Sequence, residues 1–201
     1  MRIAAIADIH YRANSTGTMR QLLGDIEQKA DLLVMAGDFT DTGLTSEMEV
    51  LVKDLKQIRL PMVAVLGNHD YESDQEEVLK KMMRDAGIML LDGGAVCEFG
   101  GVGFVGTKGY AGGFGSHMIQ PFGERNLKTF IQESVDEAVR LENALAKLDC
   151  AHKVGVLHYS PIVGTLEGES PELFPFLGCT RLANALDRHG VDVIVHGHAH
   201  H

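Results

Sequence analysis

The sequence has few cysteines, few basic residues and no long apolar run, and each shortage excludes a class of protein. Its three cysteines, Cys97, Cys150 and Cys179, are odd in number, far apart and without a Cys-x-x-Cys pair. They therefore indicate neither a disulfide framework nor a zinc knuckle, and a reducing, cytoplasmic setting fits them best. No stretch approaches the ~18 apolar residues that span a bilayer, so we expect no membrane partner. The apolar residues 1–7 meet Asp8 too early to form the core of a secretory signal.

Basic residues are outnumbered by acidic residues, 18 to 28, which gives a formal net charge of −10. This balance argues against a surface that neutralises nucleic-acid phosphates, and an anionic substrate would have to be attracted by bound cations. The hydrophobic content of 45% and the charged content of 23% are those of an ordinary soluble globular protein. We expect residues 1–201 to form a single domain.

Short aliphatic runs alternate with helical patterns along most of the chain. Runs without polar alternation predict strands buried on both faces, at residues 2–7, 32–36, 62–66, 154–157 and 191–195. Apolar residues spaced by three and four predict helices, at residues 18–29, 47–58, 75–85, 130–148 and 181–189. Ser46 and Asp74 are the expected N-caps of the second and third helices. Three closely spaced runs, at 88–91, 95–99 and 102–105, predict a hairpin or a second sheet, and the whole pattern predicts a layered α/β fold.

Five of the predicted strands are followed by polar residues that can bind metal ions. The clusters are Asp8 and His10, Asp38, Asn68 and His69, His158, and His198 and His200. Open α/β sheets bind their ligands at the carboxyl ends of the strands, where these clusters lie. A mixture of carboxylate, amide and imidazole donors suits divalent metals. A single Asp or His after a strand is usually a turn or capping residue, but that explanation does not account for five clusters together.

In their order and spacing the clusters resemble the calcineurin-like metallophosphoesterase superfamily. Its pattern is Asp-x-His, Gly-Asp-x-x-Asp, Gly-Asn-His-Asp/Glu, a lone His and Gly-His-x-His. The matching segments are Asp8-Ile9-His10, Gly37-Asp38-Phe39-Thr40-Asp41, Gly67-Asn68-His69-Asp70, His158 and Gly197-His198-Ala199-His200. The resemblance implies an α/β/β/α sandwich of mixed sheets flanked by helices, with a metal site at the strand carboxyl ends.

The resemblance also implies a site with two divalent ions, which would be Mn, Fe or Zn. One ion would be held by Asp8, His10, Asp38 and His200, and the other by Asp38, Asn68, His158 and His198. A metal-bound hydroxide would attack phosphorus, and His69 would act as the general acid, with Asp41 fixing its tautomer and orientation. Asp70 is expected to be structural.

The expected activity is hydrolysis of a phosphoester. The protein phosphatase branch of the superfamily carries arginines at positions where this chain has Thr42 and Leu66. Because arginine suits bidentate phosphate contacts, their replacement favours a small phosphodiester or phosphomonoester as the substrate. Members of the superfamily usually continue past Gly-His-x-His into further strands. We therefore expect either that such strands follow residue 201 in a longer chain or that the metal itself anchors the end at His200.

Two other functions compete with this interpretation. One is a non-catalytic metal-binding interaction scaffold on the same fold, although such scaffolds tend to lose ligands and this chain has them all. The other is a dinucleotide-dependent oxidoreductase, because residues 101–106 satisfy Gly-x-Gly-x-x-Gly and Glu124 follows about 20 residues later. Residues 107–115 lack the helical periodicity that this motif requires, and the histidines would stay unexplained. Thr107 and Lys108 also reverse the Lys-then-Ser/Thr order of a phosphate-binding loop.

Two long irregular segments are predicted, at residues 107–126 and 159–179. Loops of this length are uncommon unless they are functional or disordered. Since the second segment begins directly after His158, we expect it to cover the metal site. Tyr159, Phe174 and Phe176 are its candidate pocket residues.

Overall fold

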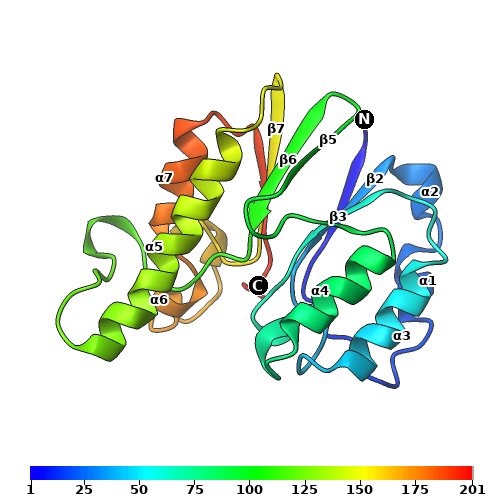
Figure 1. Ribbon diagram of the computed structural model, residues 1–201, viewed down its shortest axis with the longest axis horizontal. Coiled ribbons are helices and arrows are strands. Elements are labelled where there is room, and N and C mark those ends of the chain that lie inside the picture. Colours follow the sequence, from blue (N-terminus) through cyan, green and yellow to red (C-terminus); the bar gives the residue numbers. More distant parts are fainter. Residues whose placement is uncertain (201) are drawn as a thin grey trace.

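The computed structural model describes residues 1–200, in which two four-stranded sheets pack face to face between layers of helices (Figure 1). The first sheet is parallel, with the order β1 (Ile3–Ile6), β2 (Leu32–Ala36), β3 (Met62–Val65) and β4 (Met89–Leu90). The second has the order β5 (Val96–Phe99), β6 (Val102–Thr107), β7 (His152–Leu157) and β8 (Val193–Val195). Within it, β5 is antiparallel to β6 and the other pairs are parallel. The α/β/β/α sandwich is confirmed.

Most of the helices lie on the two outer faces of the sheets. The helices are α1 (Thr18–Leu23), α2 (Ile26–Lys29), α3 (Thr45–Leu55), α4 (Glu76–Asp85), α5 (Arg125–Leu145), α6 (Phe174–Leu177) and α7 (Thr180–Arg188). Helices α1, α3 and α4 cover the first sheet, and α5 and α7 cover the second (Figure 1). No helix in residues 1–200 combines the length and apolarity that crossing a membrane requires.

The alternation of side chains along the inner strands explains the four layers. In β2, Leu33 and Met35 belong to the core beneath α3 and α4, whereas Val34 faces the second sheet. In β6, Phe104 faces the first sheet and Val105 packs in the core beneath α5 and α7. Because both faces of these strands are covered, they appear in the sequence as nearly unbroken apolar runs.

Several predicted boundaries were wrong. The predicted helix at 18–29 is two short helices, since the chain breaks at Gly24 and Asp25 between them. The run at 88–91 contributes β4 to the first sheet, so the hairpin comprises β5 and β6 alone. Helix α5 begins five residues before the predicted start, at Arg125, within the segment predicted to be irregular.

The predicted N-caps were also wrong. Helix α3 begins at Thr45 and α4 at Glu76, so neither Ser46 nor Asp74 occupies a capping position. At the start of α3 the carboxylate of Glu47 accepts the backbone N–H groups of Thr42 and Leu44, at 3.0 and 3.4 Å. A carboxylate inside the first turn thus takes the role that the sequence assigned to a hydroxyl before it.

The carboxyl ends of the parallel strands meet at one edge of the sandwich. Backbone hydrogen bonds continue past the strands there, from Asp8 N–H to the Gly37 carbonyl at 3.1 Å and from Gly197 N–H to the His158 carbonyl at 3.2 Å. The first of these bonds joins the loops after β1 and β2, and the second joins the loops after β7 and β8. In Figure 1 this edge lies at the lower ends of the strands, near the C-terminal residues.

Candidate metal centre

Four of the predicted ligands have a left-handed backbone conformation. The φ angles are 54° at Asp8, 43° at His10, 50° at Asp38 and 69° at His198. In residues 1–200 only one other non-glycine residue, Asp74, has a positive φ. Such a conformation costs roughly 1–2 kcal/mol in an L-residue and persists where the surroundings impose it. Its concentration at these positions indicates that the loops are shaped to aim these side chains.

Glycines directly before three of the predicted ligands leave room for predicted ligands from neighbouring loops. A Cβ on Gly67 would lie 2.2 Å from Asp38 Oδ1, and one on Gly197 would lie 2.5 Å from Asp8 Oδ2. A Cβ on Gly37 would lie 2.5 Å from His158 Nδ1. These separations are too short for any other residue, so the glycines allow carboxylates and an imidazole to approach the backbone of a neighbouring strand end.

Asp38, Asn68, His158 and His198 form what we call the inner group. His158 Nδ1 lies 2.9 Å from the Ala36 carbonyl, which can only accept, so Nδ1 carries a hydrogen. His158 Nε2 then faces Asn68 Oδ1 at 2.8 Å and Asp38 Oδ1 at 3.3 Å. Three atoms with lone pairs converge there, and a proton or a cation is needed between them. A histidine that donates its other N–H to a backbone carbonyl is the usual arrangement of a metal ligand, so the inner group fits a divalent ion.

The charges of the inner group are strongly coupled. Burial acts to raise the pKa of Asp38, but the hydrogen bond and charge of His158 outweigh it and lower that pKa. Burial acts to lower the pKa of His158, and Asp38 in turn raises it overall. Burial and then repulsion from His158 lower the pKa of His198 to about 4. His198 is therefore neutral at pH 7 and has a lone pair available for a cation.

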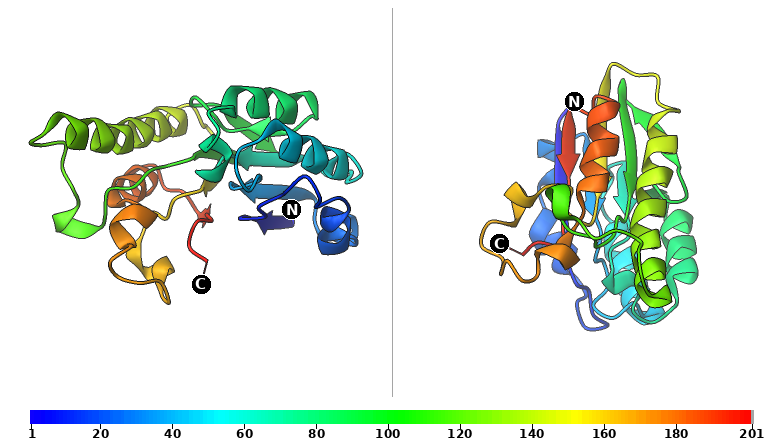
Figure 2. Two further views of the ribbon diagram at one scale, coloured as in Figure 1. Left: turned by 90° about the horizontal axis from the view of Figure 1, so that it is seen from below. Right: turned by 90° about the vertical axis from the view of Figure 1, so that its left-hand side faces the viewer.

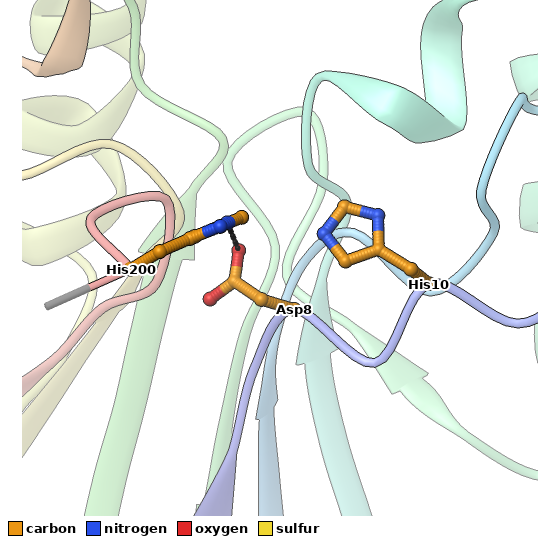
Figure 3. A group of neighbouring side chains, drawn as sticks. All are labelled: Asp8, His10 and His200. Atoms are coloured by element: carbon orange, nitrogen blue, oxygen red, sulfur yellow. Dashed lines mark ion pairs between the residues drawn. The ribbon is translucent and has the colours of Figure 1, made fainter.

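Asp8, His10 and His200 form the outer group (Figure 3). His200 Nε2 lies 3.6 Å from Asp8 Oδ1, and in Figure 3 the carboxylate of Asp8 has the imidazoles of His200 and His10 on either side. His10 Nε2 is buried and has no hydrogen-bond partner in residues 1–200, although Asp38 Oδ2 is 3.9 Å away. A buried imidazole nitrogen without a partner is unusual, and a metal ion would satisfy it.

Asp38 of the inner group also faces His10 of the outer group, and His69 lies beside it. His69 Nε2 is 4.0 Å from Asp38 Oδ2, and His69 Nδ1 is 2.7 Å from the main-chain carbonyl of Asp41. Asp41 thus contacts His69 through its backbone, whereas its carboxylate pairs with Arg12 Nε at 2.9 Å. Donor atoms of His10, Asp38 and His69 also lie within 4.8 Å of one another, so geometry alone permits His69 as a ligand.

Asp70 has the structural position expected of it. Its buried carboxylate accepts the N–H groups of Phe39, Thr40 and Gly67 at 2.9 to 3.0 Å, and the Thr40 hydroxyl at 2.7 Å. Burial raises the pKa of Asp70 although these donors oppose the shift. The side chain joins the loops that carry Asp38 and Asn68.

The segment at 159–179 contacts the last two predicted ligands. Glu169 accepts the backbone N–H of His200 at 2.8 Å, and the Phe176 carbonyl is 3.4 Å from His198 Nε2. The Tyr159 ring lies 4.3 Å, centroid to centroid, from the His198 ring. In both views of Figure 2 the orange segment around α6 lies beside the red C-terminal residues. Phe174 instead lines a separate surface pocket with Phe114 and other residues.

Sequence reasoning missed Lys108, which follows β6 directly. Its carbonyl accepts the N–H groups of His158 and Tyr159, at 3.1 and 3.0 Å, and burial lowers the pKa of its ammonium. Residues 101–106 lie mainly in β6, so they are strand and turn glycines and not a dinucleotide motif. The available signal was position, because Lys108 follows the carboxyl end of a strand as the ligand clusters do.

Comparisons with known proteins identify the family of this chain. Over residues 1–201 the chain matches the sequence model of the family described as calcineurin-like phosphoesterase. It is 29% identical over 204 residues to Purple acid phosphatase 3 of Arabidopsis thaliana, and the match covers 89% of this chain and 51% of that protein. The chain thus spans about half the length of this relative.

The fold is similar to a crystal structure described as phosphopantetheinyl hydrolase (PptH) from Mycobacterium tuberculosis. The TM-score is 0.72 at 16% identity, and the alignment covers 99% of this chain and 83% of that chain. At this identity the similarity shows the fold alone. The family match covers the whole sequence and includes every residue of the inner and outer groups, so the chain belongs to the calcineurin-like phosphoesterase family.

Proposed function

We propose that this protein hydrolyses a small phosphodiester or phosphomonoester with two divalent ions, of Mn, Fe or Zn. The observation that carries the proposal is the convergence of the inner and outer groups on Asp38, whose two oxygens face His158 at 3.3 Å and His10 at 3.9 Å. Ions held by these donors would neutralise the phosphoryl oxygens and lower the pKa of a bound water. The relative from Arabidopsis thaliana, described as a purple acid phosphatase, supports phosphoester chemistry.

His69 is the proposed general acid. Its Nδ1–H is donated to the Asp41 carbonyl, which fixes the ring so that Nε2 faces the side of Asp38. The ring has carboxylates on both sides, since that of Glu72 is 3.6 Å from Nδ1 and that of Asp38 is 4.0 Å from Nε2. When Nε2 gives its proton to the leaving oxygen, the remaining tautomer keeps its hydrogen bond to Asp41.

The replacement His69→Asn tests this role. With Mn²⁺ loaded, we expect esters with poor leaving groups to slow by about 100-fold or more, because they need the proton. Nitrophenyl esters, whose leaving group is stable as an anion, should slow much less. The measurement is kcat for a series of phosphoesters of rising leaving-group pKa, with bound metal counted by mass spectrometry. His152→Asn, which changes an exposed histidine at the start of β7, is the control.

Two outcomes would reject the general-acid role. Equal slowing of all esters with two ions still bound would remove the need for a proton from His69. Loss of one ion would instead make His69 a metal ligand, as its distance to His10 and Asp38 permits.

The non-catalytic scaffold is the alternative function. Stoichiometric binding of metal without turnover of chromogenic monoesters and diesters would favour it. We also propose a reducing, cytoplasmic setting, which rests on the spacing of the three cysteines, all free in the structure. Titration of freshly isolated protein should find three reactive thiols after unfolding, and fewer would contradict that setting.

A further inference from the structure

A pocket of about 380 Å³ adjoins the inner group. Asn68 forms one wall, and the remaining walls comprise Lys108, two glutamates and three tyrosines, Tyr71, Tyr110 and Tyr159. The volume lies within the roughly 300–1,000 Å³ of small-molecule sites. Because Asn68 is a member of the inner group, a substrate whose phosphoryl group lies at the metal centre has room to extend into this pocket.

The ammonium of Lys108 is held by aromatic rings instead of by carboxylates. Its Nζ lies 4.7 Å from the ring centroid of Tyr110 and 5.4 Å from those of Tyr71 and Tyr159. These are cation–π distances, and they fix the charge in place without neutralising it. Tyr159 also packs against Tyr110, at 5.9 Å, and against the ligand His198, at 4.3 Å, so the rings connect Lys108 to the inner group.

Lys108 has unused hydrogen-bonding capacity. An ammonium carries three donors, yet the one hydrogen bond of Nζ within residues 1–200 goes to the carbonyl of the next residue, Gly109, at 2.9 Å. Across the same residues no ion pair includes Lys108 within 4.0 Å. The pocket therefore contains a positive charge with free donors beside a site that receives an anion.

The nearby carboxylates are engaged elsewhere. Glu133 accepts from Arg140 at 2.8 Å, and Glu137 accepts from Arg140 at 2.6 Å and from Gly109 N–H at 3.0 Å. Glu72 is half-exposed and lies 3.6 Å from His69 Nδ1. The charge of Lys108 thus remains available to a ligand.

We propose that Lys108 is a substrate-binding residue, which donates to an anionic oxygen of the phosphoester while the three tyrosines hold its ammonium in position. The oxygen belongs either to the phosphoryl group being hydrolysed or to a second anionic group in the rest of the substrate. This inference rests on the proposed function in one respect, that the ligand is a phosphoester.

The test is binding of two probes to the Mn²⁺-loaded protein, measured by titration calorimetry. Inorganic phosphate carries one anionic group, and 3-phosphonopropionate adds a carboxylate. We expect Lys108→Met to raise the Kd by about 10-fold, because a charged hydrogen bond is lost, and Lys108→Arg to stay within about 3-fold of the original. Equal weakening of both probes assigns the oxygen to the phosphoryl group, and greater weakening for phosphonopropionate assigns it to a second group. Lys108→Gln provides a second loss of charge should Lys108→Met not fold.

Lys153→Met is the matched control. Lys153 Nζ also donates to a carbonyl, that of His189 at 3.0 Å, but Lys153 lies near the start of β7, away from the end that carries His158. Unchanged affinity in a folded Lys108→Met protein with both ions overturns the inference, as does a wild-type protein that binds neither probe. Turnover is measured separately. Hydrolysis combined with Lys108-independent binding rejects the role of Lys108 alone, whereas Lys108-dependent binding without hydrolysis supports that role and rejects the proposed activity.

Discussion

The inner and outer groups contain similar donors but differ in how firmly the fold holds them. The side chains of Asp38 and His158 are 1% and 0% exposed, and both follow strands in the middle of their sheets. The side chain of His200 is 58% exposed and that of Asp8 is 17% exposed. Ordering an exposed side chain costs conformational entropy when the ion binds, whereas a buried side chain has already lost that entropy when the protein folds. We therefore expect the inner group to bind its ion more tightly than the outer group does.

The backbone contacts follow the same contrast. His158 is fixed by a hydrogen bond to Ala36 in the neighbouring sheet, at 2.9 Å. In the outer group, His200 is held through its N–H by Glu169 at 2.8 Å, and the carboxylate of Asp8 accepts the N–H of His198, near the C-terminus, at 3.0 Å. The outer group thus depends on a loop and on the last residues that the structure describes.

The largest effect should come from Asp38→Asn, which should weaken metal binding at the inner and the outer group alike. Asp38 faces both, so the loss of its charge weakens both ions together. We expect kcat/KM to fall by at least about 100-fold, because changes even to residues that only support a ligand cost 10- to 100-fold. Bound metal should fall at both sites in the same titration. Asp31→Asn, which changes an exposed aspartate paired with Arg2, should leave both quantities unchanged.

Retention of one tightly bound ion in Asp38→Asn would contradict a shared ligand. The two groups would then be independent sites, and Asp38 would belong to the one that loses its ion.

A smaller and more selective effect is expected from comparing His158→Gln with His200→Gln. His158→Gln should remove the inner ion, and its activity should not recover at high Mn²⁺. The buried site loses a proposed ligand that packs between Asp38 and Ala36. His200→Gln should raise the Mn²⁺ concentration for half-maximal activity by about 10-fold and recover at excess metal, because one exposed ligand of several is lost. Activity measured against free Mn²⁺ separates the two. Equal metal requirements in both variants would show that burial does not distinguish the groups.

The sequence predicted the buried strands better than it predicted the ends of the helices. The strands of the inner layers were predictable, because residues such as 32–36 are buried on both faces and form unbroken apolar runs. The candidate ligands were predictable as a set, since each follows a short apolar run. For β1 and β8 the predicted burial on both faces was wrong, because these strands lie at the sheet edges and are partly exposed. The break between α1 and α2 was not, because Met19, Leu22, Leu23 and Ile26 continue the helical spacing through Gly24 and Asp25.

Other features could not be predicted, because no local sequence pattern specifies them. The start of α5, from Arg125 to Thr129, contains a single apolar residue, the exposed Leu127, which is too little to mark a helical period. The two residues of β4 join the first sheet through pairing with Val63 and Ala64, which no local pattern specifies. Lys108 acquires its significance from Tyr71 and Tyr159, 37 residues before it and 51 residues after it.

The smallest effect tests how the outer group is anchored. Glu169→Ala removes the carboxylate that accepts the His200 N–H, and leaves the imidazole of His200 in place. Exposed charged contacts contribute roughly 0.2–1 kcal/mol, so the outer ion should bind about 2- to 5-fold more weakly while the inner ion is unaffected. Glu167→Ala, two residues earlier on the same segment, removes the same charge from an exposed side chain that makes no hydrogen bond within residues 1–200. Equal shifts in the two variants would mean that general electrostatic attraction, and not the contact with His200, supports the outer ion.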